Sequence, residues 1–175
     1  MNIDMSVGSP GRPAPGAIGA RLSVMMFLQF FVWGAWYVSQ TGFMLDKGMG
    51  GLISWAYTVG PIAAIVSPFF LGMIADKFFP TQRVLAVLHI LGGLVMFAVP
   101  QSAELFVDAK TSGAAYLQPY ILLLLLHMLC YMPTLGLTTS LALTHMTKPE
   151  RQFPMIRVWG TIGWIVGNIV VGGNL

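Results

Sequence analysis

Long apolar stretches dominate the pattern of hydrophobic and polar positions along this chain. Five of them approach the length of about 20 helical residues that crosses the hydrocarbon core of a bilayer. They lie near Leu22–Leu45, Leu52–Ile74, Arg83–Val99, Tyr120–Leu143 and Ile156–Val171. Polar connections separate them, and the longest of these runs from Gln101 to Gln118. The pattern predicts an all-α, polytopic bundle of membrane-spanning helices.

Polar side chains recur inside the first, fourth and fifth stretches at the spacing i, i+4, i+7, i+11. This spacing places four side chains on one face of a helix. The stripes are Gln29, Trp33, Trp36 and Gln40, then His127, Tyr131, Thr134 and Thr138, and then Arg157, Thr161, Trp164 and Asn168. A polar face in lipid is costly unless it meets protein, water or a ligand. The stripes therefore predict three inner helices around a polar cavity, with the third span, which offers only His89, outside them.

The chemistry of this predicted cavity indicates a neutral polar solute. Aromatic faces stack on flat rings, whereas amides and hydroxyls recognise ring edges and sugar hydroxyls. A nucleoside fits this description, and a sugar fits the same groups equally well. Trp33 and Trp36 also suit a packing or interfacial role. Arg157 could instead extend its guanidinium toward lipid phosphates.

Composition supports the membrane assignment and narrows the chemistry. The chain is 56% hydrophobic and 9% charged, whereas soluble domains are about 25% charged. A net charge of +3 is too small to indicate a nucleic-acid partner. The sequence shows no phosphate-binding loop, metal-ligand cluster or nucleophile–base arrangement, so we expect neither an enzyme nor a cofactor. The acidic residues lie outside the spans or at their ends, which leaves His89 and His127 as candidate proton carriers or as neutral hydrogen-bonding groups.

The distribution of basic residues predicts the orientation. The N-terminal tail and the second and fourth connections hold Arg12, Arg21, Lys77, Arg83, Lys148, Arg151 and Arg157, and the opposite side holds Lys47 and Lys110. The N-terminus should therefore be cytoplasmic and the connection 101–118 extracytoplasmic. Residues 1–21, rich in proline and glycine, are expected to form a disordered tail, followed by one membrane domain over 22–175.

A short motif at the end of the second stretch resembles the signature of the major facilitator superfamily. It consists of Gly72, Asp76 and Lys77, followed by Arg83. Glycine allows close approach of a neighbouring backbone. Asp76 can pair with a cation or a helix N-terminus and so hold one conformation of a gate. The alternative is an ordinary charged connection at the membrane surface.

Longer runs are similar to the bacterial nucleoside:proton symporter family of that superfamily. They lie at 28–37 (LQFFVWGAWY), 67–76 (SPFFLGMIAD), 83–89 (RVLAVLH), 130–134 (CYMPT) and 153–164 (FPMIRVWGTIGW). The resemblance implies a transporter of about twelve helices that carries nucleosides inward with protons across the bacterial inner membrane.

The same resemblance implies site residues and an expected extent. It places Arg157, Thr161 and Trp164 in the nucleoside site, together with residues of a C-terminal half. Because five spans fall one short of a six-helix half, we expect this chain to be the N-terminal portion of such a transporter. The alternatives are a facilitator for sugars or other small polar metabolites and a non-transporting, truncated membrane protein.

Overall fold

The computed structural model describes residues 15–78, 80–105 and 114–173, with side chains described for 16–69, 80–105 and 114–173. Within these residues the regular structure is entirely helical. The elements are α1 (Pro15–Tyr37), α2 (Ser39–Asp46), η1 (Gly50–Leu52), α3 (Ile53–Phe78), α4 (Thr81–Gln101), η2 (Ser102–Leu105), η3 (Ala115–Leu117), α6 (Pro119–Thr144) and α7 (Pro149–Gly172). Five candidate membrane spans result, because α1 and α2 together form the first. The prediction of an all-α bundle with five spans is confirmed.

The first span is interrupted at Val38, between α1 and α2. The backbone N–H of Thr41 bonds to the carbonyl of Val38 at 3.4 Å. The carbonyl of Tyr37 instead accepts a hydrogen bond of 2.9 Å from the Tyr57 hydroxyl of α3. That hydroxyl also lies 2.7 Å from Thr41 Oγ1. A side chain from another helix thus satisfies the backbone group that the interruption frees, as the lipid environment requires.

A sharp turn after α2 brings the chain back into the second span. Gly48 has a φ of +71°, a conformation that glycine adopts without steric cost. Its N–H bonds to Leu45 O at 3.0 Å, and Met49 N–H bonds to Met44 O at 2.7 Å. These two bonds are those of a Schellman motif. The flanking methionines Met44 and Met49 are both fully buried, which fixes the turn against the core.

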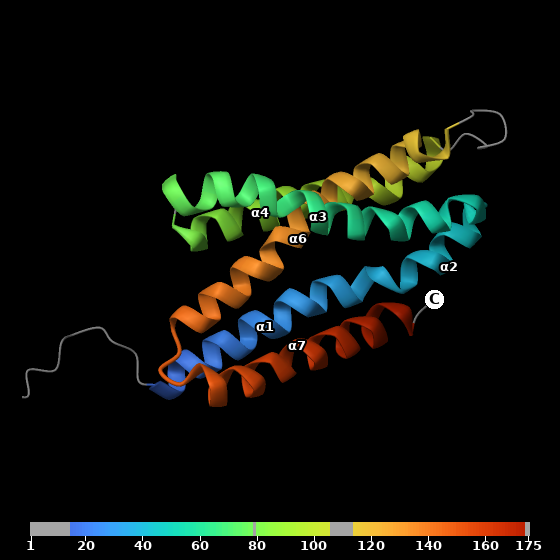
Figure 1. Ribbon diagram of the computed structural model, residues 1–175. Coiled ribbons are helices and arrows are strands. Elements are labelled where there is room, and N and C mark those ends of the chain that lie inside the picture. The colour runs from blue at the N-terminus through green and yellow to red at the C-terminus, as the bar shows by residue number, and fades with distance from the viewer. Residues whose placement is uncertain (1–14, 79, 106–113, 174–175) are drawn as a thin grey trace, which may run out of the picture.

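The helices are arranged around α6 (Figure 1). Helices α3 and α4 lie along one side of the bundle, and α1 and α7 lie side by side along the other. Helix α6 crosses between them and packs closely on both α3 and α4. Near the beginning of α7, a small apolar cluster joins three helices through Leu22, Met26, Ala142 and Ile156.

Glycine residues bring α1 and α7 into backbone contact. A Cβ atom at Gly163 would collide with the carbonyl oxygen of Phe27, and one at Gly167 would lie 2.5 Å from Phe31 O. In the opposite direction, a Cβ atom at Gly34 would collide with the carbonyl oxygen of Trp164. Such close approach is possible only for residues without a side chain, as in other membrane helix pairs. The Gly163–Gly167 spacing is therefore used as a helix-packing motif.

Two helices begin seven residues earlier than the apolar pattern suggested. Helix α1 begins at Pro15, so residues 15–21 are helical and the expected disordered tail is corrected there; residues 1–14 lie outside the described part. Helix α7 begins at Pro149, ahead of the expected Ile156. In both cases proline suits the first helical position, where its missing N–H has no intrahelical partner. The Gln152 side chain also accepts a 3.0 Å bond from the N–H of Lys148, the residue before α7.

Candidate functional site

The polar stripes of the first and fourth spans face each other in antiparallel order. Gln29 meets Thr134 and Thr138, and Trp33 meets Tyr131 at a ring-centroid distance of 5.9 Å. Further along, Trp36 meets His127 edge-on at 5.3 Å, and Phe43 of α2 stacks on Tyr120 at 6.3 Å. We call this contact the α1–α6 seam. Its geometry brings together residues that the sequence had only placed on separate faces.

One end of the seam is closed by hydrogen bonds. The Gln29 side chain, 4% exposed, donates from Nε2 to Thr134 Oγ1 at 2.7 Å. Its Oε1 accepts a bond of 3.2 Å from Thr138 Oγ1. The Tyr131 hydroxyl donates to the backbone carbonyl of Gln29. Gln29 therefore has protein partners on both ends of its amide, and at this depth it joins two helices.

The other end of the seam carries buried polar atoms without such partners. Among the described residues, no hydrogen-bond partner is present for Nε1 of Trp33 and Trp36, for either amide atom of Gln40, or for Nε2 of His127. His127 does donate from Nδ1 to the carbonyl of Gly92 on α4, at 2.8 Å. Buried polar groups are nearly always paired in proteins, so this end differs in kind from the end at Gln29.

The stripe on α7 runs along the edge of the α1–α7 contact. The buried positions of this helix are Ile156, Gly160, Gly163 and Gly167, and each stripe residue directly follows one of them. One residue is a rotation of about 100°. The stripe therefore flanks the contact with α1, and Arg157, Trp164 and Asn168 are partly buried while Thr161 is exposed.

Two stripe residues rest on aromatic side chains of α1. The guanidinium carbon of Arg157 lies 4.0 Å from the ring centre of Phe30, in cation–π geometry. Trp164 packs edge-on against Trp33, with 4.9 Å between ring centroids. A Cβ atom at Gly160 would lie 2.7 Å from the Phe30 ring and 2.8 Å from Arg157 Nη1, so this glycine leaves the room for the cation–π contact.

Tyr37 and Tyr57 belong to the same aromatic group, although sequence reasoning missed them. The Tyr37 ring lies 5.5 Å from Trp33 and 5.8 Å from Trp164. Tyr57 packs edge-on against Tyr37 at 5.1 Å while its hydroxyl bonds to the Tyr37 carbonyl. Tyr37 is i+4 from Trp33, which is a signal the stripe could have contained. Nothing in the sequence pointed to Tyr57, because its role depends on the interruption at Val38.

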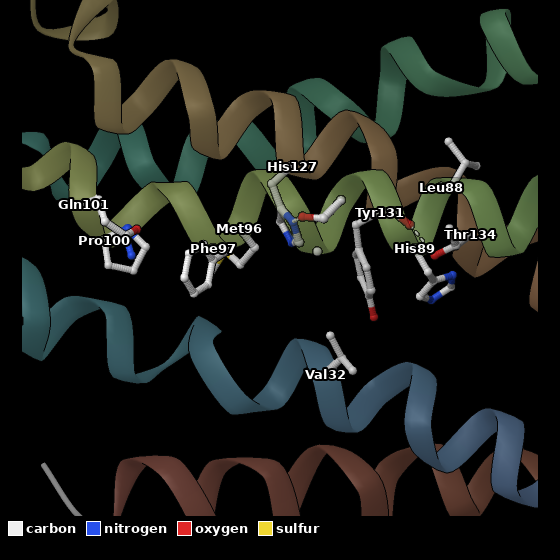
Figure 2. Close-up of a pocket in the computed structure, with 12 residues that line it drawn as sticks. Val32, Leu88, His89, Met96, Phe97, Pro100, Gln101, His127, Tyr131 and Thr134 are labelled. Atoms are coloured by element: carbon white, nitrogen blue, oxygen red, sulfur yellow. Dashed lines mark hydrogen bonds between the residues drawn. The ribbon is translucent and has the colours of Figure 1, made fainter.

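A separate cavity of about 520 Å³ lies between α1, α4 and α6. Figure 2 shows His89 of α4 together with His127, Tyr131 and Thr134 of α6 on its wall, and Val32 of α1 opposite them. The remaining lining is largely apolar. The cavity reaches the seam through His127 and Tyr131, but it does not include the α7 stripe. The expectation that the third span lies outside the cavity is wrong here, because α4 forms much of its wall.

The facilitator-like motif is described only in part. Its Gly72, Asp76 and Lys77 lie in the last turns of α3, but their side chains fall outside the described residues. Arg83 is exposed in the first turn of α4. The gating role of this motif stays a prediction. Among the described residues, no group of three or more His, Cys, Asp or Glu side chains is placed to hold a metal ion.

These features together define a multi-pass helical membrane protein whose first, fourth and fifth spans carry aromatic, amide, hydroxyl and guanidinium groups. Residues 17–172 match the family described as Nucleoside H+ symporter. The chain belongs to this family, which is a family of transporters and not of enzymes. The recognition made from the sequence runs is thereby confirmed, including its position as the N-terminal portion of such proteins.

In several relatives, the matched region covers most of this chain but only about a third of the relative. The putative nucleoside transporter YegT of Escherichia coli (strain K12) is 43% identical over 154 residues, which cover 87% of this chain and 33% of YegT. The nucleoside permease NupG of the same organism is 32% identical over 157 residues, covering 86% and 35%. Its xanthosine permease is 31% identical over 158 residues, covering 86% and 34%. The chain thus spans about a third of the length of these relatives. No solved structure matches it.

Proposed function

We propose that this chain forms the N-terminal part of a proton-coupled transporter that takes up nucleosides across the bacterial inner membrane. Support comes from the family match over 17–172 and from relatives named as nucleoside and xanthosine permeases. The N-terminus is cytoplasmic in this proposal, as the positions of the basic residues predict. The substrate is a nucleoside, the coupling ion is the proton, and no other cofactor is required.

The observation that carries the substrate assignment is the meeting of the α7 stripe with the aromatic face of α1. Trp164 and Trp33 pack edge-on at 4.9 Å, and Arg157 lies on Phe30 beside them. Indole rings provide stacking surface for a nucleobase, worth about 1–3 kcal/mol per base. A guanidinium provides a planar set of donors for its polar edge. Thr161 and Asn168 extend the same row with a hydroxyl and an amide for sugar hydroxyls.

Exposure of Thr161 supports the position of the site at an outer face of this five-span unit. A hydroxyl and a guanidinium along one helix row are unfavourable toward lipid tails. We infer that this row faces an aqueous pathway that the rest of the transporter completes. Residues of the α1–α6 seam, including Gln29, Gln40, Tyr131 and Thr134, line or support the same pathway in this proposal, with Trp36 as a second stacking ring.

A chimeric transporter tests the proposal directly. Residues 17–172 would replace the matching third of NupG in cells that lack nucleoside uptake, and insertion would be checked by membrane fractionation. We expect uptake of radiolabelled uridine that unlabelled nucleosides, but not glucose, compete away. A protonophore should abolish the uptake. A chimera that inserts but takes up no nucleoside would refute the assignment, and competition by sugars would favour the sugar facilitator.

A further inference from the structure

The end of the α1–α6 seam beyond Trp33 contains a concentration of buried polar atoms. Gln40 is 5% exposed and His127 is 3% exposed. The Trp36 ring lies 5.3 Å from that of His127, and Gln40 follows Trp36 by four residues in the first span, just beyond the interruption at Val38. Within the described part of the chain, the Trp36 Nε1, the two amide atoms of Gln40 and His127 Nε2 have no hydrogen-bond partner.

The donor and acceptor character of these atoms can be assigned. A carbonyl oxygen only accepts, so the 2.8 Å contact with Gly92 O places the proton of a neutral His127 on Nδ1. Its Nε2 is then an acceptor, as is Gln40 Oε1. Trp36 Nε1 and Gln40 Nε2 are donors. The group therefore offers both kinds of partner and carries no net charge.

We propose that Trp36, Gln40 and His127 form an internal hydration site, which holds one or two water molecules between the first and fourth spans. Water both donates and accepts, and it is the smallest molecule that satisfies this set. Buried waters typically make about three hydrogen bonds to polar groups that would otherwise be unpaired. His127 is also part of the wall of the cavity in Figure 2, so there is space for water beside this one member of the group.

The other end of the seam explains why water is needed here. Gln29 is satisfied by Thr134 and Thr138, which lie opposite it on α6. On α6, the contacts of Trp36 with His127 and of Phe43 with Tyr120 lie at the two ends of residues 121–126, which are one isoleucine and five leucines. None of these side chains can pair with the Gln40 amide. Water supplies at this end the partners that hydroxyl groups supply at the other.

Thermal unfolding of the 175-residue chain in detergent tests the proposal by the sign of a shift. Gln40→Met keeps the size of the side chain and removes its polar atoms. In a hydrated seam the water loses two partners, and we expect the melting temperature to fall by about 2–4 °C, the usual effect of one hydrogen-bonded contact in a chain of this size. In a dry seam the variant removes two unpaired polar atoms, so an unchanged or higher melting temperature would overturn the proposal. Gln82→Met, at an exposed position of α4 away from this cavity, is the matched control.

Hydroxyl-radical labelling of the wild-type chain in H₂¹⁸O separates water from a direct protein contact. We expect oxidation of His127 despite its burial, with ¹⁸O appearing there later than at the exposed His145. Lack of oxidation at His127 would mean that Gln40 pairs with protein, and would overturn the proposal even if Gln40→Met lowers the melting temperature. Stability that is lost when Na⁺ is replaced by choline would assign the site to a cation instead. Neither measurement involves nucleoside transport.

Discussion

Helix α1 meets α7 and α6 through two contacts of opposite character. In the contact with α7, Gly34 of α1 and Gly163 and Gly167 of α7 allow the backbones of the two helices to touch. Toward α6, helix α1 presents Gln29, whose amide is held by Thr134 and Thr138. The first contact depends on the absence of side chains, and the second depends on specific polar side chains.

The difference shows how much freedom each contact allows. Tight glycine packing has no adjustable atoms, because a methyl group at Gly163 would meet the Phe27 backbone. In the polar seam, each amide or hydroxyl can exchange one partner for another or for water. A transporter has to keep some helices fixed while others rearrange. We therefore expect α1 and α7 to move as a unit and the α1–α6 seam to change.

The largest effect should come from filling the glycine contact with Gly163→Leu. The side chain would force α7 away from the Phe27 backbone, at a cost at or above the roughly 1–3 kcal/mol typical of overpacking. We expect the variant to lose most of its folded population in size-exclusion chromatography and thermal unfolding. Gly93→Leu on α4 is the control, since a Cβ atom there has no neighbour within 4 Å. Equal behaviour of the two variants would contradict the glycine packing.

The variant Arg157→Lys tests whether a residue at the α1–α7 contact also binds the nucleoside. Lysine retains the charge but loses the planar fork of donors and the flat stacking on Phe30. In the NupG chimera we expect uridine uptake to fall at least about tenfold, which corresponds to about 1.4 kcal/mol, with unchanged membrane insertion. Near-normal uptake would instead show that the guanidinium only reaches for lipid phosphates.

Trp33 belongs to both contacts, because it touches Tyr131 of α6 and Trp164 of α7. If its indole stacks on the nucleobase, Trp33→Ala should weaken nucleoside binding to the chimera by about 1–3 kcal/mol, whereas Trp33→Phe should retain much of the affinity. Equilibrium binding of radiolabelled uridine measures both. Unchanged affinity in Trp33→Ala, with intact folding, would make the ring a packing element.

The smallest effect is expected at the hydrogen-bonded end of the seam. Gln29→Leu removes the two side-chain bonds between α1 and α6, and such bonds contribute about 0.6 kcal/mol each in membrane proteins, so we expect a loss of roughly 1 kcal/mol in thermal unfolding. Thr139→Val is the control, because the Thr139 hydroxyl bonds only within its own helix, to Leu135 O at 2.8 Å. If Gln29→Leu lowers the free energy of unfolding no more than the control does, the hydrogen bonds of Gln29 do not hold α1 and α6 together.

The class of the protein and the polar faces of its helices could be predicted from the amino-acid sequence. Hydrophobicity over some 20 residues is a local property, so the five spans follow from composition along the chain. Helical periodicity is local as well, so spacing alone placed Gln29 on one face with Trp33 and Arg157 on one face with Trp164. The symporter family could likewise be identified from continuous runs of similar residues, which need no knowledge of how the helices pack.

Which of these faces meet depends on how the helices pack in three dimensions. Gln29 and Thr134 are 105 positions apart, so only the antiparallel crossing of α1 and α6 makes them partners. The spacing of Gly163 and Gly167 can be read in the sequence, but their packing partner, the backbone of α1 at Phe27 and Phe31, cannot. Tyr57 has a role only because the first span is interrupted at Val38 and frees the Tyr37 carbonyl. Periodicity fixes where a side chain lies around its own helix axis, whereas its partner depends on how neighbouring helices cross.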